Sequence, residues 1–307
     1  MLLILSSDPG LDLKEAFSRS LFLILAVVCK VQFSIQINDL SDREEDKAAG
    51  KRRWTGRLSY PFSLAVPMAF IALGLATAVF AGRSQAAILA YIVSTLLGLF
   101  YSSRPVRFKE RGIWGLIVYA LSATIIFVVV PWAWFDSSLF MLFILFAVVF
   151  SDKWVQIHFH QVVDYQNDRE CGTRTFVLQI GLKRARSTLR GAAFLASFCT
   201  AGLLFHQLFL SKRTVLQQVV LLLCSAAVVA ASGVYVRIIK RKPAASSALV
   251  KELPWIYLGL TYLVFYALPP LGFILLALKE PLMWIMVVLS ALSLAGISRQ
   301  SIRYQTQ

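Results

Sequence analysis

The sequence predicts an all-α protein, a multi-pass transmembrane helical bundle of about nine helices around a central cavity. Three observations support this class. Of the 307 residues, 58% are hydrophobic and only 15% are charged, which is more apolar surface than a soluble domain of this length buries. Uncharged runs recur at about the 20 residues that a membrane helix needs. These runs lack the alternation of barrel strands, and backbone groups in lipid must be satisfied internally, so we expect helices.

The expected helices follow one another along a single domain that comprises residues 1–307. A short N-terminal segment, 1–17, precedes a helical bundle over 18–299. We expect helices over 19–38, 58–82, 84–103, 113–134, 138–163, 191–211, 214–236, 253–278 and 281–298. Prolines within these spans, such as Pro67 and Pro131, are expected to kink or end a helix.

The net charge of +15 follows the topology of these helices. Most of the 31 lysines and arginines fall in alternate loops, after the first, third, fifth and seventh helices, and in the C-terminal tail. Because such residues gather on the cytoplasmic side of membrane proteins, the alternation predicts the orientation. It also indicates membrane lipids rather than nucleic acid as partners. We expect a multi-pass protein of a plasma membrane or a cell inner membrane.

Two acidic clusters lie at the ends of the first and fifth expected helices, both on the basic side. The first cluster holds five of the sixteen acidic residues. Asp39, Asp42 and Asp46 are spaced i, i+3 and i+7, so a helix presents them on one face. Asp164 and Asp168, spaced i and i+4, also share a face. Polar faces on two helices predict an internal cavity, because polar groups in lipid are costly.

The chemistry of these clusters favours a metal and a phosphate ligand. Carboxylates on one face repel one another and stay ionised only if cations lie among them. Oxygen ligands without histidine or cysteine favour Mg²⁺, which binds through carboxylates, waters and substrate phosphates. Nearby basic residues are expected to contact the remaining phosphate oxygens. These are Arg104, Arg107, Lys109, Arg111, Arg174 and Lys183. The competing interpretation, solvated helix ends, explains one cluster more easily than two.

Three motifs resemble those of the UbiA superfamily of intramembrane prenyltransferases. Residues 38–46 read N-D-x-x-D-x-x-x-D, and 164–168 read D-x-x-x-D, followed by Gly-Thr-Arg-Thr at 172–175. The loop 101–112 is similar to the Tyr-Ser-x-Pro-Pro-x-[KR]-x-Lys loop of the chlorophyll-synthase, homogentisate and archaeal ether-lipid branch. The family usually has one more helix before the first motif's helix, so we expect a truncated or mis-assigned start.

The resemblance implies an enzyme, a Mg²⁺-dependent prenyltransferase. Such an enzyme transfers a prenyl group from an allylic prenyl diphosphate to an aromatic ring or a lipid alcohol and releases diphosphate. Two alternatives stay open: a membrane terpene cyclase that needs no acceptor, and a non-catalytic lipid-binding or transport protein. The implied catalytic residues are Asp39, Asp42, Asp164 and Asp168, which with Asp46 are also the implied metal ligands. The implied diphosphate-binding residues are Asn38, Tyr101, Arg107, Lys109, Arg174 and Lys183.

Ionisable residues within the fifth expected helix predict an acceptor site. Asp152 and Lys153 lie midway along this helix, where a charged residue is costly and marks function by default. The alternative is that they pair with each other, or with Lys30, and hold helices together. His160 is a candidate proton acceptor in aromatic prenylation, or else a hydrogen-bonded cavity residue.

Overall fold

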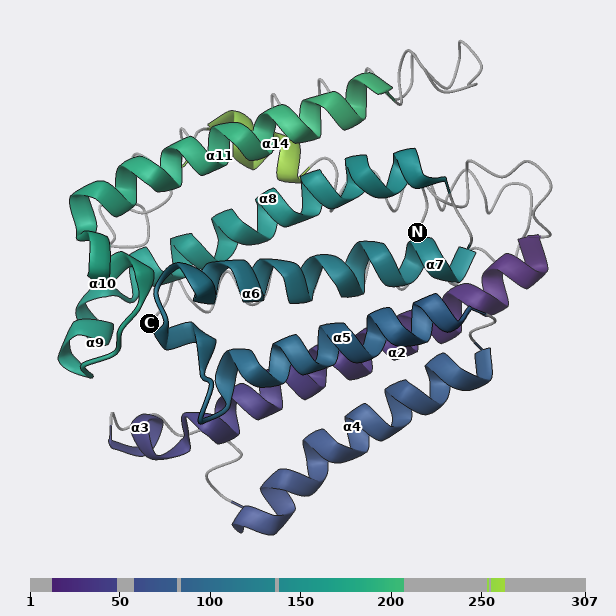
Figure 1. Cartoon of the computed structure of the whole chain (residues 1–307), viewed down its shortest axis with the longest axis horizontal. Helices are drawn as coiled ribbons and strands as arrows, with labels where there is room; N and C mark the ends of the chain where they lie inside the picture. The colour runs from purple at the N-terminus through teal and green to yellow at the C-terminus, as the bar shows by residue number, and fades with distance from the viewer. Residues whose placement is uncertain are drawn as a thin grey trace. The chain divides into compact units, whose positions relative to one another are not determined.

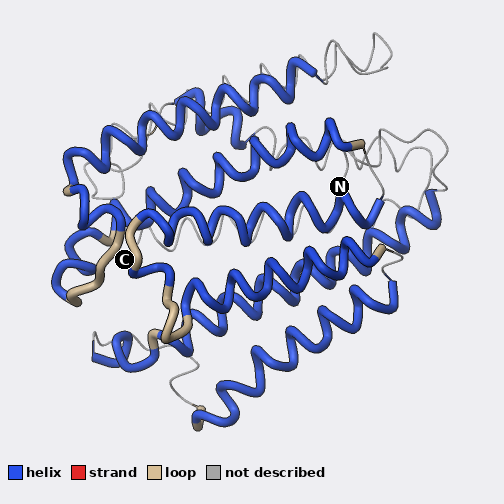
Figure 2. Tube along the Cα trace, viewed as in Figure 1, coloured by secondary structure: helices blue, strands red, loops and turns tan. Residues whose placement is uncertain are grey.

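The structure, a computed structural model, is helical throughout the parts of the chain that it describes. These are residues 13–48, 58–81, 84–135, 138–206, 253 and 255–262. Figure 2 shows helices joined by short loops, with no strand drawn among the described residues. The predicted all-α class is confirmed.

The chain divides into two compact units. One spans residues 18–187 and contains both acidic clusters and the basic loop. The other comprises 2–17 and 188–307, of which the structure describes mainly the larger part of α11 (Leu182–Phe205), from residue 188 on, and α14 (Trp255–Tyr262). The prediction of a single domain stays a prediction.

Six helices of the described residues are long and apolar enough to cross a membrane, judged by length and composition. They are α2 (Leu13–Ser41), α4 (Tyr60–Ala81), α5 (Gln85–Ser102), α6 (Ile113–Thr124) continued to Phe135, α8 (Leu139–Val163) and α11 (Leu182–Phe205). The predicted helices over 214–236 and 281–298 lie outside the described residues, and α14 covers part of the one over 253–278. The count of nine therefore stays a prediction.

Helix α11 begins earlier than the predicted start at residue 191. Its first two turns carry Lys183, Arg184 and Arg186, which are exposed, whereas Ala185 and Leu189 are buried. A hydropathy pattern alone therefore excluded turns that are helical but amphipathic.

The fourth span widens where a proline interrupts its hydrogen bonds. Between α6 and α7 (Val130–Phe135) lies a π-helical turn, η3 (Ile125–Val129), in which the Val130 N–H bonds to the Ile125 carbonyl. Pro131 has no N–H to donate, and its ring would clash with the carbonyl four residues earlier. A π turn just before it relieves that clash, so the predicted disturbance at Pro131 is local.

Apolar packing holds the helices of the first unit side by side. Helix α5 packs on α4 and α6, and α6 packs on α8 (Figure 1). The core includes Leu23 of α2, Tyr91 of α5 and Trp134 of α7. Other large apolar side chains, such as Leu89 and Phe143, are exposed. This outward apolar surface is expected of helices whose solvent is lipid.

The polar segments of this unit lie at one end of its helices. Figure 1 shows α3 (Arg43–Ala48), the loop between α5 and α6, and α9 (Tyr165–Glu170) at that end. Helices α2 and α8 both end there, so two motifs that are far apart in the sequence meet. The short helix α10 (Phe176–Ile180) follows α9 and contacts both α8 and α9.

Candidate active site

The first acidic cluster continues α2 through one turn into α3. The Asp42 N–H bonds to the Asn38 carbonyl at 3.0 Å, and the Asp46 N–H bonds to the Asp42 carbonyl at 2.8 Å. Asn38, Asp42 and Asp46 are thus spaced i, i+4 and i+8 along a nearly continuous helix. All three line a pocket of about 260 Å³, and we call this side the first wall.

Asp39 takes a different position from its predicted partners. It lies in the last turn of α2, is only 7% exposed and does not line the pocket. The chain turns at Asp42, between α2 and α3, so Asp39 and Asp46 belong to different helices. The three helical residues that line the pocket are Asn38, Asp42 and Asp46, whereas the spacing predicted Asp39 in place of Asn38. A role for Asp39 as a metal ligand stays a prediction.

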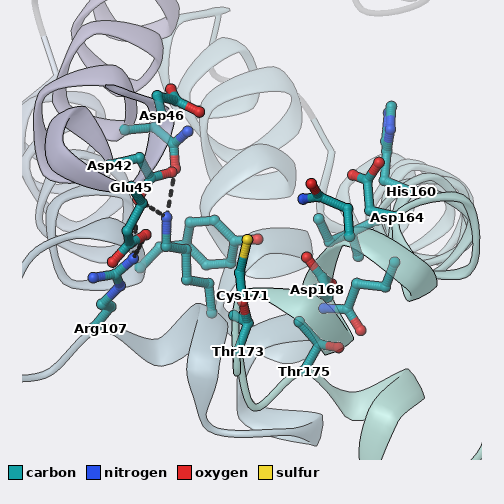
Figure 3. Close-up of a pocket in the computed structure, with 16 residues that line it drawn as sticks. Asp42, Glu45, Asp46, Arg107, His160, Asp164, Asp168, Cys171, Thr173 and Thr175 are labelled. Atoms are coloured by element: carbon teal, nitrogen blue, oxygen red, sulfur yellow. Dashed lines mark hydrogen bonds and ion pairs between the residues drawn. The ribbon is translucent and has the colours of Figure 1, made fainter. Parts of the chain in front are cut away.

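The loop between α5 and α6 places two cations on Asp42. Arg107 Nη2 donates to Asp42 Oδ1 at 3.0 Å and to Glu45 Oε2 at 2.6 Å. Lys109 Nζ also donates to Asp42 Oδ1, and it reaches Asn38 Oδ1 at 3.4 Å. Figure 3 shows dashed lines around Asp42, Glu45 and Arg107 on one side of the pocket. Two basic residues of the loop therefore pair with Asp42 on the first wall.

Arg107 is held in an unusual position. It is 4% exposed, and its backbone φ of 40° lies in the left-handed region that residues other than glycine seldom adopt. Its Nε forms an ion pair with Glu110 at 2.8 Å. Burial alone would lower the pKa of Arg107, but the hydrogen bond to Glu45 and the nearby carboxylates raise it. The same hydrogen bond lowers the pKa of Glu45, so both groups stay ionised.

The second acidic cluster begins where α8 ends. Asp164 is both the C-cap of α8 and the N-cap of α9. Its carbonyl accepts a hydrogen bond from the Asp168 N–H at 2.7 Å. Asp164, Asn167 and Asp168 line the pocket together with His160, and we call this side the second wall. Figure 3 shows Asp164, Asp168 and His160 across the pocket from Asp42 and Asp46. No basic residue of the described chain pairs with Asp164.

A backbone bridge joins the basic loop to the segment after α9. The Gly112 N–H bonds to the Arg174 carbonyl at 3.4 Å, and Gly112 forms an isolated bridge with Thr175. Gly112 has φ 59° and ψ −125°, a conformation that only glycine adopts readily. The bridge keeps Thr173 and Thr175, which line the pocket, next to the basic loop.

Several predicted site residues lie away from the pocket. Arg174 and Lys183 are exposed and do not line it. Asp152 is 2% exposed, pairs with Lys153 at 3.5 Å and accepts from Gln156 Nε2 at 2.7 Å, all on α8. This is the local pairing that the sequence left open as an alternative. Roles for these residues in diphosphate or acceptor binding stay predictions.

Tyr101 and His160, by contrast, do line the pocket. Tyr101 lies in the last turn of α5, next to Ser102, whose hydroxyl contacts Asn38, and its ring centroid is 5.6 Å from that of Tyr119. His160 lies in the last turn of α8, one turn before Asp164. Both are therefore placed to contact a ligand in this pocket.

Seven of the lining residues were not among the predicted site residues, and four of them are polar or charged side chains of the motif segments: Glu45, Asn167, Thr173 and Thr175. Glu45 and Asn167 each follow a predicted aspartate by three residues, so helical spacing carried a signal for them. The two threonines lie in a loop without periodicity, and the Gly-Thr-Arg-Thr motif was their only signal. Ile157, Gln161 and Cys171 complete the lining.

The donor set fits a hard divalent cation that a ligand helps to bind. Within the described residues, no three His, Cys, Asp or Glu side chains lie close enough to hold a metal ion by themselves. Both walls nevertheless offer carboxylate and amide oxygens. Mg²⁺ commonly takes one or two carboxylates and completes its shell with waters and substrate phosphates. Asp42 and Asp46 from one wall and Asp164 and Asp168 from the other could hold such ions.

These features describe an apolar bundle of membrane-length helices with a charged pocket at one end. The model of the UbiA prenyltransferase family matches residues 3–251, which is most of the chain. The protein belongs to this family and is a prenyltransferase, so the predicted resemblance is confirmed.

Solved structures of UbiA homologues share the fold. The homologue from Archaeoglobus fulgidus bound to DMAPP and Mg²⁺ has a TM-score of 0.58 and 22% identity, over 83% of this chain and 88% of that chain. The same homologue bound to GPP and Mg²⁺ has a TM-score of 0.59 and 20% identity, over 85% of this chain and 90% of that chain. The apo homologue from Aeropyrum pernix K1 has a TM-score of 0.61 and 18% identity, over 89% of this chain and 93% of that chain. No curated protein sequence matches the chain.

Proposed function

We propose that the protein transfers a prenyl group from an allylic prenyl diphosphate to an acceptor, an aromatic ring or a lipid alcohol, with Mg²⁺ and release of diphosphate. The observation that carries this proposal is the pocket with facing walls, on which Asp42 and Asp164 lie opposite each other and two cations occupy one side. In support, the Archaeoglobus fulgidus homologue binds DMAPP or GPP together with Mg²⁺.

The residues would divide the work of binding the diphosphate. Asp42, Asp46, Asp164 and Asp168 are the proposed metal ligands, with Asp39 as a further one. Bound Mg²⁺ would neutralise the charge that grows on the leaving diphosphate. Lys109 would exchange Asp42 for a phosphate oxygen, since a flexible ammonium changes partners more easily than a clamped guanidinium. Asn38 and Tyr101 line the same space and would orient the diphosphate.

The transfer itself breaks the bond between the prenyl C1 and the diphosphate oxygen, and the electron pair leaves with diphosphate. The acceptor carbon or oxygen then bonds to C1 and loses a proton, for which His160 is the proposed acceptor. Apolar helices around the prenyl chain would keep water from the cationic carbon. The alternation of basic loops supports an active site on the cytoplasmic side of a plasma or cell inner membrane.

The direct test is to identify the product. Membranes that contain the protein are incubated with labelled geranyl, farnesyl and geranylgeranyl diphosphates and a native lipid extract. We expect a labelled adduct whose mass equals prenyl plus acceptor, whose formation stops with a chelator and resumes with Mg²⁺. The Asp39→Ala and Asp164→Ala variants should not release diphosphate.

The other outcomes discriminate between functions. A cyclised hydrocarbon that forms without the lipid extract would identify a terpene cyclase. Saturable binding of the prenyl diphosphate without its consumption, unchanged in both variants, would identify a lipid-binding or transport protein.

A further inference from the structure

Arg107 contacts three carboxylates, two of them by hydrogen bonds from Nη2 and the third by an ion pair at Nε. Nη2 lies 3.0 Å from Asp42 Oδ1 and 2.6 Å from Glu45 Oε2, while Nε lies 2.8 Å from Glu110 Oε1. Asp42 therefore receives one of several contacts of this guanidinium. The shortest of them goes to Glu45, a residue that lies between Asp42 and Asp46 in the sequence and lines the pocket.

This division of contacts bears directly on metal binding. An arginine that is free to form both parallel hydrogen bonds with one carboxylate binds it strongly and with defined geometry. Such a pair on Asp42 would occupy the oxygens that a metal ion needs. Glu45 shares Nη2 with Asp42, and Glu110 lies beside Nε, so the printed contact of Arg107 with Asp42 involves Oδ1 alone. The side chain of Arg107 is only 5% exposed, which fixes this arrangement further.

We infer that Glu45 is a positioning residue that keeps Arg107 from neutralising Asp42 fully and so leaves Asp42 available to the divalent cation. This inference rests on the proposed function, since it assigns a purpose to Glu45 within the same pocket. Without Glu45, the freed Nη2 donor turns to Asp42, and the cation must compete with a tighter Arg107–Asp42 pair. The variant should need more metal, but it should reach a similar rate once the metal saturates the site.

The chain offers a matched control in the neighbouring residue. Glu44 is exposed and does not line the pocket, so Glu44→Gln makes the same change of charge one position away. Binding of Mn²⁺ in the presence of inorganic diphosphate can be followed in the full-length protein by electron paramagnetic resonance of the free ion. Mn²⁺ suits the same oxygen ligands as Mg²⁺. We expect Glu45→Gln to weaken Mn²⁺ binding about fivefold and Glu44→Gln less than about twofold.

A double-mutant cycle separates positioning from direct ligation. If Glu45 acts through Arg107, then Glu45→Gln should have no further effect on Mn²⁺ binding in an Arg107→Met background. An undiminished effect in that background would show that Glu45 itself ligates the metal and would overturn the inference. Equal Mn²⁺ affinities of Glu45→Gln and Glu44→Gln would overturn it as well.

The proposed function has its own point of failure in the same experiment. If the wild-type protein binds no Mn²⁺ with diphosphate, the metal site itself is absent and the proposed function falls. If the wild-type protein binds Mn²⁺ and only the variants disagree with expectation, the role of Glu45 alone is wrong. A parallel Mg²⁺ titration of turnover should show a raised half-saturation concentration for Glu45→Gln with kcat nearly unchanged.

Discussion

The two walls of the pocket carry the same kind of carboxylate in opposite electrostatic settings. On the first wall, Asp42 contacts both Arg107 and Lys109, and a neighbouring glutamate shares the arginine. On the second wall, Asp164 has no basic partner among the described residues. It sits instead at the junction of two helices, exposed to the pocket.

This difference suggests that the two walls have different binding roles, one toward the diphosphate and one toward the metal. The first wall already carries the basic side chains of Arg107 and Lys109, which would suit it to bind the diphosphate anion. On the second wall, Asp164 pairs with no basic residue among the described residues, which would suit it to the proposed metal. Either half alone lacks the donors for a Mg²⁺–diphosphate complex, which agrees with the absence of a preformed metal cluster in the described residues.

The largest effects should come from removing one carboxylate from each wall. Asp42→Asn and Asp164→Asn are each expected to lower kcat by at least about 100-fold, since each removes a proposed metal ligand and with it about 3 kcal/mol of stabilisation of the leaving group. The two substitutions should differ in their effect on the free energy of unfolding. Asp42→Asn leaves Lys109 and Arg107 without one anion and should cost about 1–2 kcal/mol.

Thermal unfolding in detergent tests that contrast between the walls. Asp164→Asn breaks no ion pair among the described residues and should leave the melting temperature nearly unchanged. Equal melting temperatures of the two variants would mean that Asp42 is no more engaged than Asp164, contrary to the structure.

A smaller effect is expected from the cation that bridges Asp42 and Asn38. Lys109→Met should raise the KM for prenyl diphosphate about tenfold, or about 1.4 kcal/mol, because one charge-assisted hydrogen bond to the anion is lost. The half-saturating Mg²⁺ concentration should change little or fall, since Asp42 loses a competitor. Lys47→Met, at an exposed position of α3 that does not line the pocket, is the control. A KM that stays at the wild-type value would remove Lys109 from the diphosphate site.

Much of the bundle was readable from the sequence, because hydropathy and helix length are strong signals in a membrane protein. The five spans before residue 164 follow the uncharged runs closely. The start of α11 was missed since its first turns are amphipathic rather than apolar. The π turn before Pro131 was not predictable in kind, because a proline in a helix is compatible with a kink, a break or a wider turn.

The sequence predicted the site residues at the helix ends, but it did not predict which residues pair with one another. Helical spacing placed Asp42, Asp46, Asp164 and Asp168, all of which line the pocket. The partnership of Arg107 with Glu45 and Glu110 depends on a loop with a left-handed residue, and no periodic pattern encodes such a loop. The bridge from Gly112 to Thr175 joins two segments distant in sequence, so only the folded chain reveals it.

That bridge gives a test of stability in the loop of the first wall. Gly112→Ala adds a Cβ at a φ of 59° and only 2.1 Å from Gln179 Oε1. The exposed Gln179 side chain can move away, but the backbone conformation stays unfavourable, so we expect a loss of about 2–3 kcal/mol in thermal unfolding. Gln179→Ala in the same background should recover little of this loss. Gly191→Ala, in helical α11 with nothing within 4 Å, should be neutral or stabilising by about 0.5–1 kcal/mol.

A smaller effect than that of Gly112→Ala is expected at the corresponding glycine beside the second wall. Gly172 has a φ of 70° and no atom within 4 Å of an added Cβ, so Gly172→Ala should cost only the left-handed backbone penalty of about 1 kcal/mol. Gly172→Asn should cost less than Gly172→Ala, because asparagine adopts that conformation more readily. The melting temperatures of Gly112→Ala and Gly172→Ala therefore compare the backbone beside the first wall with the backbone beside the second wall. If Gly172→Ala proves as damaging as Gly112→Ala, the segment after α9 is held as tightly as the basic loop, and the contrast between an organised wall and an open one fails at the level of the backbone.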